Sequence, residues 1–171
     1  MRRLLIVVHP GSCCGSADMN CGDEAAASIR TALAEDLADW AGGIAVIDGD
    51  LSSQLRQRAY RDFGLSLESA LQRAAEHGLT AIRIRGCSME EFDQTRAAVV
   101  LADNLALAAG GWTVEITGAW YEPGGGDGCV NSVVEALETV GVSVTVRPSA
   151  AVLDPEDAPM DEMSSRSAPC A

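Results

Sequence analysis

The chain has 171 residues, enough for one domain with a buried core; 47% of its residues are hydrophobic but only 4% are aromatic. Its 25 acidic and 12 basic residues give a formal net charge of −13, and no lysine occurs. An acidic surface repels phosphate groups, so we expect neither a nucleic acid nor a membrane surface as a partner.

The chain begins with a short apolar run, residues 4–8, which follows two arginines and ends at His9-Pro10-Gly11. This run is shorter than the roughly 7–15 apolar residues of a signal peptide, and no other stretch approaches the ~20 residues of a membrane span. We therefore expect a cytoplasmic protein whose six cysteines are reduced thiols rather than a disulfide framework.

Apolar periodicity predicts strands that alternate with helices along the chain. The expected strands are 4–8, 44–47, 79–85, 112–117 and 142–146, and the expected helices are 23–40, 51–63, 66–77, 88–109 and 129–140. Ser88-Met-Glu-Glu91 has the form of a capping box at the start of the fourth helix. This alternation predicts a three-layer α/β sandwich with a mostly parallel central sheet of five or six strands. Residues 1–153 would form this domain, and the acidic residues 154–171 would form a flexible tail.

Binding sites in such sheets form beyond the carboxyl ends of the strands. Any chemistry is therefore expected where the predicted strands end. Those ends carry His9, Asp48 with Asp50, Arg85 with Cys87, and the glycine-rich turn from Gly118 to Cys129.

Cys129 is expected in the first turn of a helix, with Asp127 as the capping residue. Backbone N–H groups and the helix dipole favour a thiolate there, and they can bind a developing oxyanion. A carboxylate close to the thiol has the opposite effect on its charge. The alternative is a small buried side chain that only packs the helix start.

The spacing around Cys129 adds a second argument. Cys129-Val130 is followed by Gly141 twelve residues after the cysteine, and Phe92-x-x-Thr95 lies after the third expected strand. These features resemble the isochorismatase-like cysteine hydrolases, the superfamily of nicotinamidases and N-carbamoyl amidohydrolases. The resemblance implies the hydrolysis of a small amide, carbamoyl or related C–N substrate, and a homo-oligomer. We expect no cofactor and no metal ion, because the metal-binding Asp and His cluster of nicotinamidases has no counterpart here.

The resemblance also implies a triad of Asp, Lys and Cys, of which this chain keeps only Cys129. His9 stands at the aspartate position, and Arg85 stands near the lysine position. A histidine can deprotonate a thiol, whereas an arginine can hold a thiolate or a substrate carboxylate but exchanges no proton near neutral pH. We therefore expect Cys129 to act with His9 and Arg85. The expected pocket residues are Gly118, Trp120, Tyr121, Asp127 and Gly128.

Three other functions stay open at this level. The first is an oligomeric or binding protein that keeps the fold without catalysis. The loop with Cys13, Cys14 and Cys21, next to His9, carries ligands suited to zinc or copper(I), or to redox chemistry. Residues 124–128 form a glycine-rich turn before a helix, as in phosphate sites, but the nucleotide-binding fingerprints are absent from the sequence.

Overall fold

The computed structural model describes residues 1–10, 22–48, 66–85, 93–126 and 128–152. The strands are β1 (Arg2–Val8), β2 (Gly43–Asp48), β3 (Ala81–Arg85), β4 (Trp112–Tyr121), β5 (Val144–Val146) and β6 (Ala151–Val152). The helices are α1 (Gly22–Asp39), a helix over residues 66–76, α3 (Gln94–Leu105), the short 3₁₀ helix η3 (Leu107–Ala109) and α4 (Cys129–Thr139). The predicted alternation of strands and helices is confirmed.

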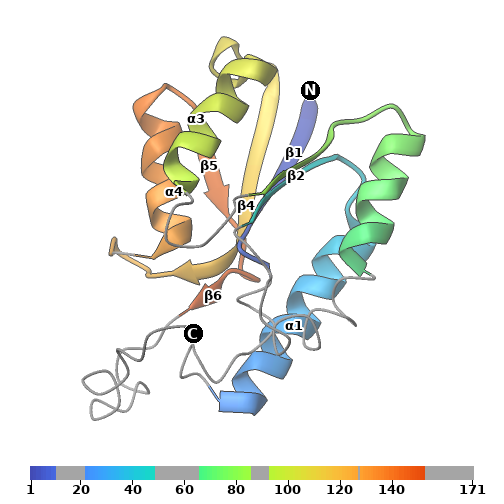
Figure 1. Cartoon of the computed structure of the whole chain (residues 1–171), viewed down its shortest axis with the longest axis vertical. Helices are drawn as coiled ribbons and strands as arrows, with labels where there is room; N and C mark the ends of the chain where they lie inside the picture. Colours follow the sequence, from blue (N-terminus) through green and yellow to red (C-terminus); the bar gives the residue numbers. More distant parts are fainter. Residues whose placement is uncertain (11–21, 49–65, 86–92, 127, 153–171) are drawn as a thin grey trace, which may run out of the picture.

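Five strands form a parallel sheet in the order β3-β2-β1-β4-β5, and β6 pairs with the far end of β4. Figure 1 shows α1 and the helix over residues 66–76 on one side of the sheet, and α3 with α4 on the other. The molecule is therefore the α/β sandwich that the sequence predicts.

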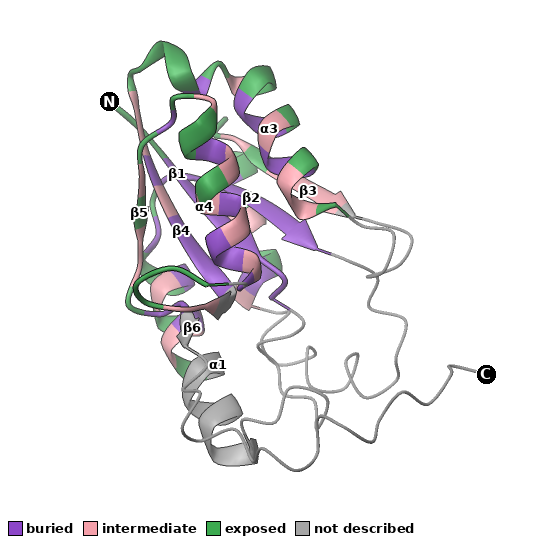
Figure 2. Ribbon diagram, turned by 90° about the vertical axis from the view of Figure 1, so that its left-hand side faces the viewer, coloured by how far each residue is buried: buried purple, intermediate pink, exposed green. Residues whose placement is uncertain are grey.

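The central strands β1 and β2 are buried on both faces, which explains their uninterrupted apolar sequences. Leu4, Ile6 and Val8 belong to the core beneath α3 and α4. Strand alternation turns Leu5 and Val7 toward α1 and the helix over residues 66–76. Figure 2 shows these strands as the most completely buried part of the chain.

Several boundaries differ from the prediction: β4 continues to Tyr121, past the expected end at residue 117, β3 and β5 begin at Ala81 and Val144 rather than at residues 79 and 142, and α3 differs at both ends. The capping box at Ser88–Glu91 is wrong as the start of α3, because its N-cap is Asp93, whose Oδ1 accepts hydrogen bonds from the backbone N–H groups of Thr95 (3.0 Å) and Arg96 (3.1 Å). The helix also ends earlier than residue 109. Ala106 adopts a left-handed conformation (φ 49°) that separates α3 from η3.

An ion-pair network ties α1 to the sheet. Arg147, just after β5, bridges Asp36 of α1 and Glu115 of β4, with 2.6 Å to the Glu115 carboxylate. Burial would raise the pKa of Asp36, but hydrogen bonds from Arg147 and Ser149 outweigh it and lower this pKa. The network thereby joins α1, the helix that connects β1 to β2, to β4 and to the residues that follow β5.

The expected helix over 51–63, the loop with Cys13, Cys14 and Cys21, and the tail over 154–171 lie outside the described residues. Within the part of the chain that is described, no helix is both long and apolar enough to cross a membrane.

Candidate functional site

The strand order places the candidate site between β1 and β4. The chain runs from β1 outward through β2 to β3, and then crosses to β4 and β5 on the other side of β1. Such a reversal is a topological switch point, where the loops that follow neighbouring strands separate and leave a crevice. His9 follows β1, and Cys129 follows β4 through the glycine-rich turn.

His9 is buried, with 2% of its surface exposed, and its backbone adopts a left-handed conformation (φ 44°). This conformation costs a residue other than glycine about 1–3 kcal/mol, and such residues cluster at functional sites. The backbone N–H of His9 donates to the carbonyl oxygen of Ile47 at 2.7 Å, which ties the turn after β1 to the end of β2.

Asp48 is the last residue of β2, and it lies beside the His9 ring. The distance from His9 Nδ1 to Asp48 Oδ1 is 3.9 Å, and both side chains are almost completely buried. Asp48 Oδ2 is also buried and has no hydrogen-bond partner in the described part of the structure. A buried carboxylate is costly unless it is paired, so its position against His9 is a specific feature of the fold.

The His9 ring also interacts with the side chain of Cys129. Burial alone would lower the pKa of His9, but its interactions with the Asp48 carboxylate and the Cys129 side chain outweigh burial and raise this pKa from 6.5 to about 9. His9 therefore carries a positive charge at neutral pH, held between a carboxylate and a sulfur atom.

Cys129 is the first residue of α4 and is half-buried. The N-cap of α4 is Gly128, one residue later than expected; Asp127, the expected capping residue, lies outside the described residues. The sulfur atom lies at the positive end of the helix dipole, which favours negative charge.

Asn131 fixes the turn that leads to Cys129. Its Nδ2 donates to the carbonyl oxygen of Glu122 and its Oδ1 accepts from the backbone N–H of the same residue, both at 2.8 Å. The side-chain amide thus bonds both backbone groups of Glu122, as a residue of a neighbouring strand would, and holds the two ends of segment 122–131 together. With 6% of its surface exposed, Asn131 is a buried support for the turn that carries Cys129.

Gly118 allows β1 and β4 to meet at this end of the sheet. It pairs with Val8 and has a φ of 125°. A Cβ atom at this position would lie 2.0 Å from the carbonyl oxygen of Val8, so no other residue fits without moving the strands apart. The glycine thereby keeps the turns that carry His9 and Cys129 close together.

The structure brings His9 and Cys129 together, and it places the other expected site residues as follows. Arg85 ends β3, in register with Asp48, but its side chain lies outside the described part, as do the side chain of Trp120 and all of Asp127. Tyr121 is half-buried at the end of β4, and Gly128 is buried before α4. No group of three or more His, Cys, Asp or Glu residues in the described ranges is arranged to hold a metal ion.

Sequence reasoning missed the roles of Asp48 and Asn131. Asp48 was recognised as a strand end, but only the strand order shows that it lies beside His9. Asn131 carried a weaker signal, a polar residue among the apolar positions of α4. Comparison of the chain with protein-family models, with curated proteins and with solved structures finds no match.

Proposed function

We propose that the protein is a cysteine hydrolase that cleaves a small amide, carbamoyl or related C–N bond on an isochorismatase-like frame. Cys129 is the nucleophile, and His9 is the proton donor and acceptor. The observation that carries the proposal is the contact of one buried histidine with both the Cys129 sulfur and the Asp48 carboxylate, at the switch point of the sheet.

The raised pKa of His9 determines the starting state. A protonated His9 next to the sulfur stabilises a thiolate, which is the nucleophilic form of cysteine. The thiolate attacks the substrate carbonyl carbon, forming a C–S bond while an electron pair moves to the oxygen. Backbone N–H groups at the start of α4 are placed to stabilise that negative charge.

The intermediate then collapses. The C=O bond re-forms, the C–N bond breaks, and His9 donates its proton to the leaving nitrogen, so that ammonia or an amine departs and a thioester remains. Neutral His9 next takes a proton from water as the water oxygen attacks the thioester. The C–S bond breaks, the acid is released, and both the thiolate and the protonated His9 are restored.

Asp48 is a positioning residue in this scheme, because it acts on the substrate through His9. Its charge favours the protonated form of the ring. Arg85, one strand further along, would hold a substrate carboxylate.

A non-catalytic binding protein on the same fold is the competing proposal, and it requires none of these features. A charged histidine in a left-handed turn lowers stability unless its partners compensate, and a half-buried cysteine beside it adds little to packing. We also propose that the protein is cytoplasmic and forms a homo-oligomer, as the family resemblance implies.

The test is to incubate the protein with a panel of small primary amides and N-carbamoyl compounds, and to measure hydrolysis by the release of ammonia. Wild-type protein should hydrolyse at least one substrate and accumulate a covalent thioester that mass spectrometry locates on Cys129. Cys129→Ser and His9→Gln should lose this activity, whereas His77→Gln, a change at the exposed second histidine, should retain it. An activity that survives Cys129→Ser, or no turnover and no adduct across the panel, would sink the proposal.

A further inference from the structure

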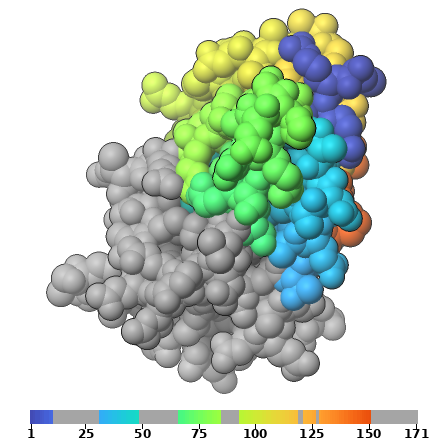
Figure 3. All heavy atoms as spheres, turned by 90° about the vertical axis from the view of Figure 1, so that its right-hand side faces the viewer, coloured from blue at the N-terminus to red at the C-terminus, as the bar shows by residue number. Residues whose placement is uncertain are grey.

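A cavity lies at the opposite end of the sheet from Cys129. It is formed by the segments that lead into the amino ends of β2 and β3, residues 38–42 at the end of α1 and just after it, and residues 73–79 at the end of the helix over 66–76 and just after it. Its volume is about 530 Å³, within the range of small-molecule sites. Figure 3 shows the face on which these two segments lie side by side.

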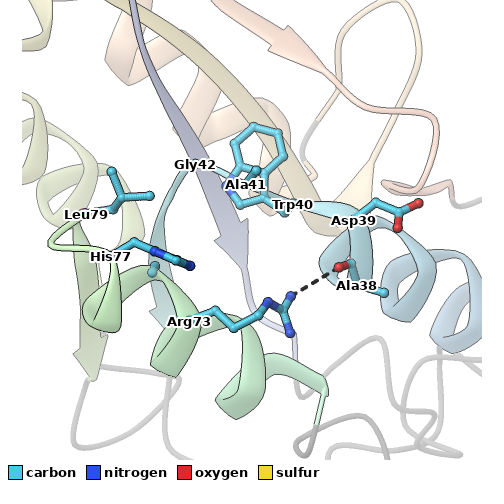
Figure 4. A pocket seen from close by; sticks show the side chains of 9 residues that line it. Ala38, Asp39, Trp40, Ala41, Gly42, Arg73, His77 and Leu79 are labelled. Atoms are coloured by element: carbon cyan, nitrogen blue, oxygen red, sulfur yellow. Dashed lines mark hydrogen bonds between the residues drawn. The ribbon is translucent and has the colours of Figure 1, made fainter.

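One side of the cavity carries positive charge. Figure 4 shows the guanidinium of Arg73, on the helix over residues 66–76, and the ring of His77, in the turn that follows this helix, both directed into the space beneath Trp40. Arg73 Nη2 donates to the carbonyl oxygens of Leu37 (2.6 Å) and Ala38 (3.3 Å) at the end of α1. These bonds fix the guanidinium in place, and its five N–H donors leave capacity for a ligand.

The other side of the cavity is apolar. Trp40 is buried, and its Nε1 already donates to the carbonyl oxygen of Gly43 at 2.9 Å, so the ring presents hydrocarbon to the cavity. Leu79 lies across from it and is 41% exposed, unusually high for a leucine in this molecule. A ligand would therefore meet the Arg73 guanidinium and the His77 ring on one side and apolar surface on the other.

The surroundings strengthen the positive charge at this end. A neighbouring cavity of about 510 Å³ shares Ala41, Gly42 and Leu79 with the first one and is lined by Arg2 and Arg3. Arg2 stacks on Trp112 at 4.1 Å, and Arg3 stacks on Trp40 at 4.3 Å. Three arginines, one of them paired with Glu115, thus gather at one end of a chain with a net charge of −13.

The carboxylates near this end are engaged elsewhere. Glu115 forms an ion pair with Arg3 at 2.9 Å, so these two charges offset each other, and Glu76 accepts a hydrogen bond from the neutral Gln72 at 2.8 Å. The carboxylate of Asp39 lines the cavity but points away from Arg73 in Figure 4.

We propose that this cavity binds a small organic carboxylate with a compact apolar body. The carboxylate lies on Arg73 and His77, and the body lies between Trp40 and Leu79. The site is separate from Cys129 and does not depend on the proposed hydrolase activity, so it is a place for an effector or a second ligand.

The test uses the full chain and two probes of similar shape, benzoate and benzyl alcohol, titrated by ¹H–¹⁵N NMR. Benzoate should move the indole signal of Trp40 and bind at least about tenfold more tightly than the alcohol, as a charge-assisted contact predicts. Equal affinities, or shifts confined to residues at the other end of the sheet, would overturn the proposal.

A pair of variants at one exposed position supplies the sharper control. Leu79→Asp places a carboxylate in the lining and should weaken benzoate binding at least about tenfold, whereas Leu79→Asn should weaken it by no more than about threefold. Arg73→Gln should also weaken binding, while Arg96→Gln on α3 should not. Arg73 also binds the carbonyl groups at the end of α1, so Arg73→Gln can lower the stability of the protein as well as its affinity. In that case the comparison of the two Leu79 variants is the test of the site. Equal affinity of the two Leu79 variants for benzoate would contradict the site.

Discussion

Replacing Asp48 by asparagine tests the electrostatic coupling at the centre of the site. His9 titrates at 6.5 when exposed and at about 9 in the folded protein. Because the folded pKa is the higher one, the stability gained from this shift is fully present below pH 6.5 and is lost as the pH rises through about 9. The difference between the two values corresponds to about 3 kcal/mol. His9 is 2% exposed, so solvent screens little of this amount.

Asp48→Asn removes the carboxylate while burial, which lowers the pKa of His9, stays. We expect the pKa of His9 to fall by at least about one unit, and the pH-dependent loss of stability between pH 6.5 and 9 to shrink by about 1.4 kcal/mol or more. Urea unfolding at the two pH values, with NMR titration of the His9 ring, measures both effects. Asp103→Asn, at an exposed position on α3, is the matched control. If Asp48→Asn leaves the pH dependence and the His9 titration as in the wild type, the coupling is refuted.

Three further predictions concern the frame of the site, and urea unfolding measures each of them. Gly118→Ala should lower the free energy of unfolding by about 3 kcal/mol or more, because the added Cβ overlaps the backbone of the neighbouring strand. Gly124→Ala, in open space, should lower it by only about 1 kcal/mol. Similar losses for the two variants would contradict the close approach of Gly118 to Val8. Asn131→Ala should lower the free energy of unfolding by about 1–3 kcal/mol, because the two hydrogen bonds to Glu122 are lost. An unchanged stability would show that the turn before α4 does not depend on Asn131. Arg147→Lys should cost about 1–3 kcal/mol because lysine cannot bridge two carboxylates with the same planar geometry, and a neutral effect would assign the network no structural role.

The positions of the central strands could be predicted from the sequence because burial on both faces leaves a simple pattern. Leu4–Val8 and Ile44–Ile47 are apolar at every position, and the structure buries all of them. The ends of elements were less predictable. Ser88–Glu91 fits a capping pattern as well as Asp93 does, and only the observed hydrogen bonds from Thr95 and Arg96 distinguish the two.

The candidate site was half predictable for a similar reason. Cys129 could be placed at a helix start from local spacing, and His9 could be placed at a strand end. Asp48 could not be assigned to His9, because apolar periodicity says nothing about which strands are neighbours. The order β3-β2-β1-β4-β5 places β2 and β4 on opposite sides of β1, and that order alone aligns the three side chains. Long-range pairs such as Asp36 with Arg147 leave no local signal at all.

The central claim is that His9 keeps the Cys129 sulfur reactive, and the rate of alkylation measures this most directly. The protein is treated with iodoacetamide at pH 7, and peptide mass spectrometry follows each of the six cysteines. Cys129 should react at least about tenfold faster than the other thiols, because the thiolate is the reacting form. His9→Gln should remove this advantage, and His77→Gln should preserve it. A Cys129 that reacts no faster than the other thiols, or equally fast without His9, would contradict the account.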